Sequence, residues 1–337
     1  MPKQIRKLWI RPEDITGCDR LLDLGDGGPP TQSLRGSHFV SSNVKWVNQA
    51  RERGPADAVD SLADLPDVSF DAAVYAPAPA ETKPRVFEWI DGVHSRLAEG
   101  GRFYLGGERH RGVESYRRRA EDVFGSATKV RQVGRRRVYC ARKGRRSGVA
   151  EIQTSYRFEC SIQGDSFSFV TRAGVFSRDH VDPGTRLLLD AIPPCQGKAL
   201  LDVGCGYGAL GIALARRGAI VTMTDVDVRS TRCAEENAKA SGASTSIVTA
   251  DLYDGVEGHR FDVIVSNPPF HSGLSFARPF VEGARRHLNP GGRIWMVVMR
   301  TEPYTLQLER YIGEVRTAVD EGGYRVLNAT LSDSLGA

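Results

Sequence analysis

The segment Asn267-Pro268-Pro269-Phe270 combines three chemical groups that could act together on one flat substrate. It follows residues 262–266, an apolar run whose pattern indicates a buried strand. Two consecutive prolines lack backbone N–H groups and have a fixed φ, so the strand must end there in a stiff turn. Ligands of open α/β sheets bind at such carboxyl ends of strands. An amide, a backbone carbonyl and an aromatic face suit a planar, nitrogen-bearing substrate, although the segment alone also fits a proline-rich turn with a packed phenylalanine.

A glycine-rich turn lies upstream, at Gly204, Gly206 and Gly208. It follows the apolar residues 198–203 and precedes a helix-like segment, so its backbone could pass close under a ligand at a helix N-terminus. Asp225 ends the next predicted strand, roughly 20 residues past the turn, which is the offset at which an acid holds ribose hydroxyls. These features predict a nucleoside-type cofactor, and they do not separate NAD from S-adenosylmethionine.

Two further acids favour S-adenosylmethionine. Asp202 directly precedes the glycine turn, where it would repel a pyrophosphate but could hold the ammonium of an amino acid, directly or through water. Gly211 lies five residues past Gly206 rather than three, so the spacing departs from G-x-G-x-x-G. Asp251, after the following strand, is placed to accept from an adenine amino group. Each acid alone could cap a strand end, but the ordered set favours a cofactor site.

Several motifs carry a family resemblance. D-V-G-C-G-Y-G (202–208), T-D-V-D (224–227) and S-N-P-P-F-H (266–271) resemble the signature of class I S-adenosylmethionine-dependent methyltransferases that alkylate exocyclic amines. The segments G-V-F-S (174–177) and G-G-E-R-H-R-G-V (106–113), with a tandem layout, are similar to the bacterial RsmC-type ribosomal RNA guanine-N2 methyltransferases. In that family a degenerate methyltransferase domain precedes an active one. The resemblance covers nearly the whole chain.

The resemblance implies a role for each motif. The expected cofactor-binding residues are Phe176, Ser177, Asp202, Gly204, Cys205, Gly206, Gly208, Asp225, Val226, Asp251, Leu252 and Asn267. The expected catalytic residues are Asn267 and Pro268, whose Oδ1 and carbonyl accept the two N–H groups of the target amine, and Phe270, which stacks on the base. Acceptors on both N–H groups favour a pyramidal nitrogen with a freed lone pair, so catalysis is mainly alignment. His271 is expected to be structural, because this chemistry requires no strong base.

The elements that must position these residues alternate along the chain. Strands are predicted at residues 20–24, 72–76, 102–106, 137–141, 198–203, 220–225, 246–250, 261–265, 293–299 and 324–328, and a hairpin at 156–170 around Gly164. Helices are predicted at residues 85–97, 115–124, 182–189, 209–217, 230–241, 276–288 and 305–312. This alternation predicts an α/β protein with two tandem Rossmann-like class I methyltransferase domains, each a mostly parallel, seven-stranded-type sheet with helices on both faces.

Three motif pairs recur in the same order in the two halves. They are 21–28 against 200–208, 70–77 against 261–268, and 97–104 against 288–295. The pairs predict an internal duplication, with shared α/β patterning as the alternative. We expect residues 1–146 to form a degenerate methyltransferase-like domain and residues 147–337 the catalytic domain, joined by a basic stretch near 143–149.

The first copy lacks the groups that the chemistry needs. Asp26-Gly27-Gly28 replaces the tight glycine turn, and Ala76 stands where the second copy has its asparagine. An alanine side chain cannot accept a hydrogen bond. We expect this domain either to support the active domain or to bind RNA. The tail connecting residues 300–304 to Tyr324 departs from the family pattern, which leaves the substrate fit there open.

Composition limits the remaining classes. The 337-residue chain, with 40% hydrophobic and 26% charged residues, has the profile of a two-domain globular protein. No apolar run approaches the ~20 residues that span a bilayer, and no secretory signal follows the basic start, so we expect a cytoplasmic monomer without a membrane contact. The six cysteines are scattered without metal-like spacing, so we expect a reduced protein without bound metal.

The net charge of +5 is unevenly distributed. Arginines cluster at residues 117–119, 135–137 and 142–146, which fits a phosphate-rich partner, either ribosomal RNA or the small ribosomal subunit. A solvated face with a basic linker explains the same clusters.

The predicted reaction is methyl transfer from S-adenosylmethionine to the exocyclic N2 amine of a guanine in 16S ribosomal RNA. The same loop type would serve a guanine of 23S ribosomal RNA, an adenine N6 or a glutamine amide. A non-catalytic RNA-binding assembly factor is a further alternative, disfavoured by the intact Asp202, Asp225 and Asn267.

Overall fold

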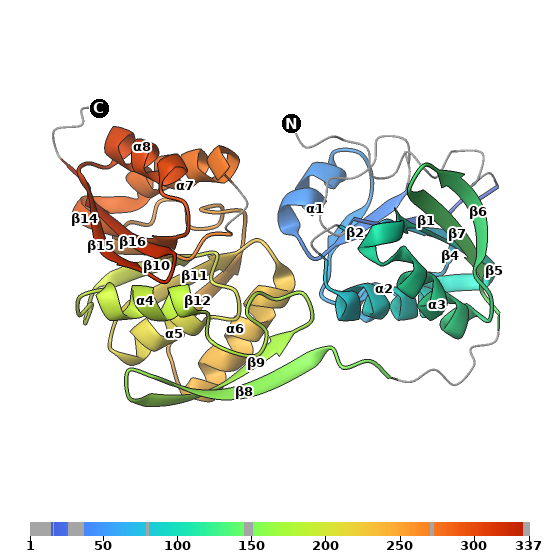
Figure 1. Cartoon of the computed structure of the whole chain (residues 1–337), viewed down its shortest axis with the longest axis horizontal. Coiled ribbons are helices and arrows are strands. Elements are labelled where there is room, and N and C mark those ends of the chain that lie inside the picture. Colours follow the sequence, from blue (N-terminus) through green and yellow to red (C-terminus); the bar gives the residue numbers. More distant parts are fainter. Residues whose placement is uncertain are drawn as a thin grey trace. The chain divides into compact units, whose positions relative to one another are not determined.

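The structure of the protein is a computed structural model that describes residues 15, 17–25, 37–78, 81–144, 151–269 and 273–332. The chain forms two compact units, Met1–Thr154 and Ser155–Ala337, and each contains one seven-stranded sheet (Figure 1). The division lies eight residues beyond the boundary expected after residue 146, and most of the basic stretch proposed as a linker lies outside the described residues. No helix in the described ranges is long and apolar enough to span a membrane.

The first unit has the strand order β3-β2-β1-β4-β5-β7-β6. Its strands are β1 (Leu21–Leu24), β2 (His38–Ser41), β3 (Ala56–Ala58), β4 (Phe70–Tyr75), β5 (Leu97–Glu108), β6 (Thr128–Val133) and β7 (Arg136–Arg142). Its α-helices are α1 (Val44–Arg51), α2 (Lys83–Arg96) and α3 (Val113–Phe124). The first five strands of this order are parallel, and β7 and β6 continue the sheet in antiparallel fashion.

The second unit has the order β12-β11-β10-β13-β14-β16-β15 and a separate hairpin, β8 with β9. Its strands are β8 (Ser155–Ile162), β9 (Asp165–Arg172), β10 (Ala199–Val203), β11 (Ile220–Asp225), β12 (Thr245–Thr249), β13 (Phe261–Ser266), β14 (Leu288–Val298), β15 (Val315–Glu321) and β16 (Tyr324–Thr330). Its helices are α4 (Pro183–Ala191), α5 (Ala209–Arg216), α6 (Val228–Ser241), α7 (Gly273–His287) and α8 (Glu302–Tyr311).

The two sheets share irregularities as well as strand order. The pairing between β4 and β5 shifts directly after Phe70, and the pairing between β13 and β14 shifts directly after Phe261. Asp71 accepts from backbone N–H groups just before β1, and Asp262 accepts from the first residue of β10. Equivalent shifts and equivalent side-chain contacts support an internal duplication rather than shared α/β patterning alone.

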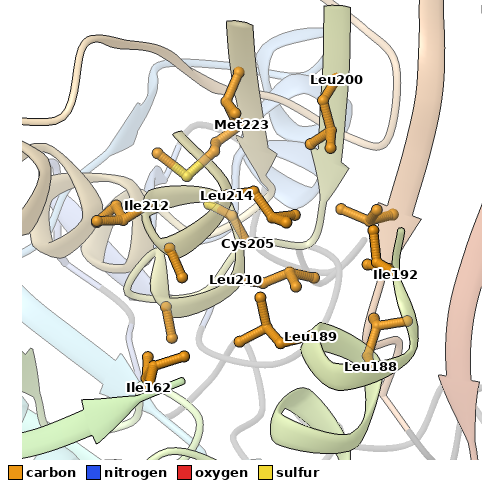
Figure 2. Packing of buried hydrophobic residues seen from close by; sticks show 14 of the residues in the cluster. Ile162, Leu188, Leu189, Ile192, Leu200, Cys205, Leu210, Ile212, Leu214 and Met223 are labelled. Atoms are coloured by element: carbon orange, nitrogen blue, oxygen red, sulfur yellow. The ribbon is translucent and has the colours of Figure 1, made fainter. Parts of the chain in front are cut away.

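The central strand of the second unit is buried on both faces. Leu200 packs in one apolar cluster and Leu201 in another, because successive side chains of a strand point to opposite faces. This explains why β10 has a continuous apolar sequence rather than an alternating one. Figure 2 shows the first cluster, in which side chains from α4, α5, β10 and β11 meet around Leu210 and Leu189. These contacts pack α4 and α5 against the sheet beside β10.

Candidate active site

The candidate site lies where the sheet of the second unit changes direction. β10 pairs in parallel with β11 on one side and with β13 on the other. Asp202 lies opposite Val265 of β13, and Val203 lies opposite Thr224 of β11. The carboxyl ends of all three strands therefore meet at a topological switch point, the position at which open α/β sheets bind ligands.

The glycine turn bends over the end of β11. Gly204 N and Cys205 N both donate to the Thr224 carbonyl, at 2.8 and 3.0 Å. Gly204, Gly206 and Gly208 have φ values of 76°, 58° and 93°, in the left-handed region that favours glycine. A Cβ added at Gly204 or Gly206 would meet no atom within 4 Å, so the backbone borders open space there. A ligand could approach this part of the main chain without meeting a side chain at either position.

Asp225 is tied to the same turn. Its Oδ2 accepts from Gly206 N at 2.8 Å, and its Oδ1 accepts from Asp227 N at 2.9 Å. Burial raises the pKa of this carboxyl to about 6, while the two backbone donors oppose the rise. The next residue, Val226, is half-buried at the start of the connection to α6. Asp225 therefore holds the glycine turn in place, and carboxylate lone pairs remain for further donors.

Asp202 lies deeper, with 1% of its surface exposed. Its Oδ2 accepts from Gly211 N, in the first turn of α5, at 3.0 Å. Burial and the nearby Asp225 raise its pKa to about 7, and the hydrogen bond from Gly211 opposes the rise. A Cβ at Gly211 would lie 2.5 Å from Met223 Sδ and 3.1 Å from Asp202 Oδ2. The glycine at 211 is thus required by close packing against β11 and the buried acid.

The remaining cofactor candidates lie around this core. Cys205 is buried, and burial raises the pKa of its thiol, so it is not a ready nucleophile. Leu252, at φ 57°, accepts from Thr224 Oγ1 through its carbonyl at 2.9 Å. Asp251, just before it, is half-buried beyond the end of β12. The structure brings these residues to the same end of the sheet as Asp225.

Asn267 follows β13 directly and has a fixed amide orientation. Its Nδ2 donates to Asp182 Oδ2 and to Thr185 Oγ1, both at 2.9 Å. A carboxylate only accepts, so the NH2 group must face Asp182 and the oxygen must face away. That oxygen, Oδ1, is buried and has no hydrogen-bond partner. Pro268 is buried beside it, whereas Phe270 and His271 lie outside the described residues.

The segment between β9 and α4 is tied to the glycine turn. Ser177 Oγ and Tyr207 OH both donate to the His180 carbonyl, at 2.7 and 3.1 Å. Ser177 has a φ of 52°, and the neighbouring Phe176 is 53% exposed. Arg229 of α6 donates to the Ala173 carbonyl at 3.0 Å. Phe176 and Ser177 therefore belong to a loop that is anchored to the cofactor side of the site.

Sequence reasoning missed several residues that build the site. Asp182 and Thr185 hold Asn267, and the pattern Asp182-Pro183 signalled only a helix start. Asn237 of α6 donates to the Val170 and Tyr207 carbonyls, at 2.8 and 2.9 Å, and accepts from Val170 N at 2.7 Å. This wholly buried amide fastens β9 to the glycine turn. No sequence pattern near position 237 predicts these long-range contacts.

The matching edge of the first unit is built differently. A Cβ on Gly25, the counterpart of Gly204, would lie 1.9 Å from the ring of Phe39, so an aromatic side chain fills space that is open in the second unit. The β1–β4 register places Ala76 directly after β4, where the second unit has Asn267. At the described positions Gly25 and Ala76, the first unit therefore has neither the open space nor the amide acceptor of the second unit. Within the described ranges neither unit contains a cluster of three or more potential metal ligands.

The fold and the ordered polar groups at its switch point define a class I methyltransferase, the class that depends on S-adenosylmethionine. A sequence model of the family described as Methyltransferase small domain matches residues 166–328. The chain is 30% identical to the Ribosomal RNA small subunit methyltransferase C of Salmonella paratyphi A, over 97% of this chain and 96% of the relative. It is 29% identical to the protein of that name from Escherichia coli O157:H7, with the same coverage.

A solved structure agrees with these relatives. The T. thermophilus 16S rRNA N2 G1207 methyltransferase RsmC, in complex with AdoMet and guanosine, superposes with a TM-score of 0.85 at 28% identity. The match covers 93% of this chain and 88% of that one. The chain belongs to the ribosomal RNA small subunit methyltransferase C family, so the family and the fold class predicted from the sequence are confirmed.

Proposed function

We propose that this protein transfers a methyl group from S-adenosylmethionine to the exocyclic N2 amine of a guanine in 16S ribosomal RNA. The observation that carries the proposal is the Asn267 amide, whose Nδ2 is engaged twice while its buried Oδ1 has no partner. A buried acceptor without a donor costs about 1–3 kcal/mol. An amine N–H that enters the site would satisfy it. Family membership and the bound guanosine of the T. thermophilus relative favour guanine.

The residues at the switch point fit S-adenosylmethionine. This group supplies an electrophilic methyl carried by a sulfonium when it is bound. The open backbone at Gly204 and Gly206 can admit it, and the Asp225 carboxylate can accept from ribose hydroxyls. The ionised form of Asp202 favours an ammonium nearby. Cys205, Gly208, Val226, Asp251, Leu252, Asn267, Phe176 and Ser177 complete the proposed cofactor set.

The chain's own groups prepare the amine. Asn267 Oδ1 and the Pro268 carbonyl each accept one N–H of the target nitrogen, which draws the nitrogen out of conjugation with the ring. Phe270 is the proposed stacking surface for the base. Acceptors that are already aimed at the amine cost no reorganisation during the reaction. The remaining requirement is alignment of the nitrogen with the methyl group. The proton that leaves the product nitrogen passes to water, so no side chain must act as a strong base.

The assignment of domains and partners completes the proposal. We place catalysis in residues 147–337 and assign residues 1–146 a supporting or RNA-binding role. Ribosomal RNA is the substrate that the family indicates, and we propose the small ribosomal subunit as its source, with the protein acting as a cytoplasmic monomer.

The test is nucleoside analysis of ribosomal RNA. RNA from cells without the protein is incubated with the purified protein and labelled S-adenosylmethionine. The RNA is then digested to nucleosides, which are identified by mass spectrometry. The proposal predicts label in N2-methylguanosine from 16S RNA. Label in N6-methyladenosine, in 23S RNA or in protein would favour the alternative acceptors, and no transfer together with no cofactor binding would favour an assembly factor.

A further inference from the structure

Two separate arginine runs meet at one corner of the first unit. Antiparallel pairing of β5 with β7 places Glu108 opposite Arg136 and Gly107 opposite Arg137. Arg109 N then donates to the Arg135 carbonyl at 3.0 Å, which extends the contact into the turn between β6 and β7. Together with a fifth guanidinium close by, these residues form what we name the arginine corner: Arg109, Arg111, Arg135, Arg136 and Arg137.

The carboxylates at the arginine corner do not balance its charge. Glu108 is shared by Arg111 at 3.3 Å and Arg136 at 3.4 Å, and His110 also lies 3.3 Å from it. Glu114 pairs with Arg137 and also with Arg117, which is not part of the corner.

Arg109 and Arg135 are exposed, and neither forms an ion pair within the part of the chain that the structure describes. Two of the five guanidiniums, those of Arg109 and Arg135, therefore lack a carboxylate partner in the described ranges, so the corner keeps an excess of positive charge.

The internal duplication supplies a control for this charge. Arg142 and Thr330 lie at equivalent places, since they pair with the equivalent residues Arg102 and Arg293. When residues are counted back from Arg142 and from Thr330 along the two hairpins, Arg135 corresponds to Gly323.

Three other positions of the turn differ in the same direction. Arg136 corresponds to Tyr324, and Gln132 and Val133 correspond to Asp320 and Glu321. In the second unit Arg325 pairs with Asp320 at 2.8 Å, so this hairpin carries no excess charge. Arg137 corresponds to Arg325, and Arg109 corresponds to Arg300, so two of the five arginines recur in the second unit. The same element folds with Gly323 and Tyr324 in place of Arg135 and Arg136, so the fold does not require those two.

The position of the arginine corner suggests its ligand. The turn between β6 and β7 lies at the carboxyl end of β5, the sheet edge that carries the candidate active site in the second unit. We propose that the arginine corner binds the sugar-phosphate backbone of the substrate RNA. Guanidiniums match phosphate oxygens in a two-pronged geometry, and the exposed Arg109 and Arg135 are available for it. The inference rests on the proposed function in that the substrate is an RNA.

The test compares two charge-matched double variants of the full chain. Arg109→Ala with Arg135→Ala removes two charges from the arginine corner, and Arg316→Ala with Arg325→Ala removes two from the equivalent hairpin. Binding of transcribed 16S RNA is measured by filter retention over a range of KCl concentrations. Each lost phosphate contact lowers the slope of log K against log [KCl] by about 0.7–0.9. We expect the first variant to lower the slope by about 1.4–1.8 and the second to leave it unchanged.

The outcomes separate this inference from the proposed function. An unchanged slope in the first variant, or an equal change in both, would overturn the arginine corner as an RNA site. Stronger binding of the wild type to phosphatidylserine vesicles than to RNA at the same KCl concentration would do so as well. Cofactor binding and methyl transfer at saturating RNA are expected to be equal in both variants. Loss of methyl transfer in the wild type would contradict the function without affecting the binding result.

Discussion

Asn267 donates its amide Nδ2 to Asp182 Oδ2 over 2.9 Å, although 85 positions separate the two residues. Asp182 also caps α4, since the same Oδ2 accepts from Thr185 N at 3.1 Å. The carboxylate fixes which way the Asn267 amide faces, and Thr185 Oγ1 adds a second acceptor. Because Nδ2 is engaged by these two acceptors, Oδ1 is the atom that remains for the amine. This contact therefore determines whether Asn267 offers the amine an acceptor or a donor.

The side chain of Asn267 is predicted to affect the reaction more than the affinity for the cofactor. Asn267→Ala removes one oriented acceptor, so we expect kcat to fall by about 10²-fold, as for the loss of one oriented hydrogen-bonding group in other active sites. The dissociation constant of S-adenosylmethionine, measured by calorimetry, is expected to stay within about twofold of the wild type. A large loss of cofactor affinity with little change in kcat would show that the residue's role is wrongly assigned.

The contact with Asp182 is predicted to orient the amide. Asp182→Ala frees Asn267 to present its NH2 group to the amine, and we expect kcat to fall by about 10-fold or more, as when a group that orients a reacting centre is lost. Loss of the helix cap costs about 1 kcal/mol of stability in addition. Asp182→Asn keeps one oxygen for both donors and serves as the control, with kcat closer to the wild type. Equal kcat values in both variants and the wild type would show that Asp182 does not orient the Asn267 amide for the reaction.

A glycine is predicted to be required at position 211 because the packing leaves no room for a side chain. Gly211→Ala places a Cβ 2.5 Å from Met223 Sδ and 3.1 Å from Asp202 Oδ2, so the helix must shift against β11. Such overpacking typically costs about 1–3 kcal/mol, and the shift should also weaken cofactor binding through Asp202. Gly242→Ala, at a helix end with φ 68° and no atom within 4 Å of its Cβ, is the control that loses stability alone. Thermal unfolding and calorimetry measure the two effects, and equal cofactor affinity in both variants would contradict the prediction.

Cofactor affinity is predicted to rise with pH. Burial raises the pKa of Asp202 to about 7 and that of Asp225 to about 6, above the usual value near 4. The folded chain therefore holds more protons than the unfolded chain between about pH 4 and pH 7, so the contribution of these groups to the free energy of unfolding falls as pH rises through that window.

The ionised carboxylates are the forms that accept hydroxyls and attract an ammonium. The dissociation constant of S-adenosylmethionine should fall between about pH 5.5 and pH 8, and Asp225→Asn should flatten that profile. A dissociation constant that is constant or increases over this range would contradict the prediction.

Local patterns predicted the strand and the glycine turn on which the proposed cofactor site is built. The strand and turn at 198–208 depend on neighbouring residues, because buried apolar strands and glycines of positive φ leave direct marks in the sequence. The fixed orientation of the Asn267 amide could not be predicted in this way. It depends on how α4 lies against β13. The contact between Asp182 and Asn267 joins distant parts of the chain, so it produces no repeating pattern in the sequence. Phe270 lies outside the described residues, so its stacking role stays a prediction.

Most buried strands were predicted, but β2, which is short, was missed together with β3 and α1. The edge strands β6 and β15 were missed, because most of their residues are exposed and polar side chains occur on both faces. β5 and β14 continue through Gly100-Gly101 and Gly291-Gly292, whereas the predicted strands began only at residues 102 and 293. These strands tolerate the glycines because their pairing with β4 and β13 shifts register there. Such irregularities depend on the neighbouring strand, so the local sequence does not reveal them.

The most direct test of the central claim compares wild-type protein with Asn267→Ala on 16S RNA from cells that lack the protein. Methylated nucleosides are quantified by mass spectrometry after a fixed time with S-adenosylmethionine. We expect N2-methylguanosine in the wild-type sample and its near-complete absence with Asn267→Ala, although both proteins bind the cofactor. Equal N2-methylguanosine in the two samples, or a methyl group on another nucleoside in the wild-type sample, would contradict it.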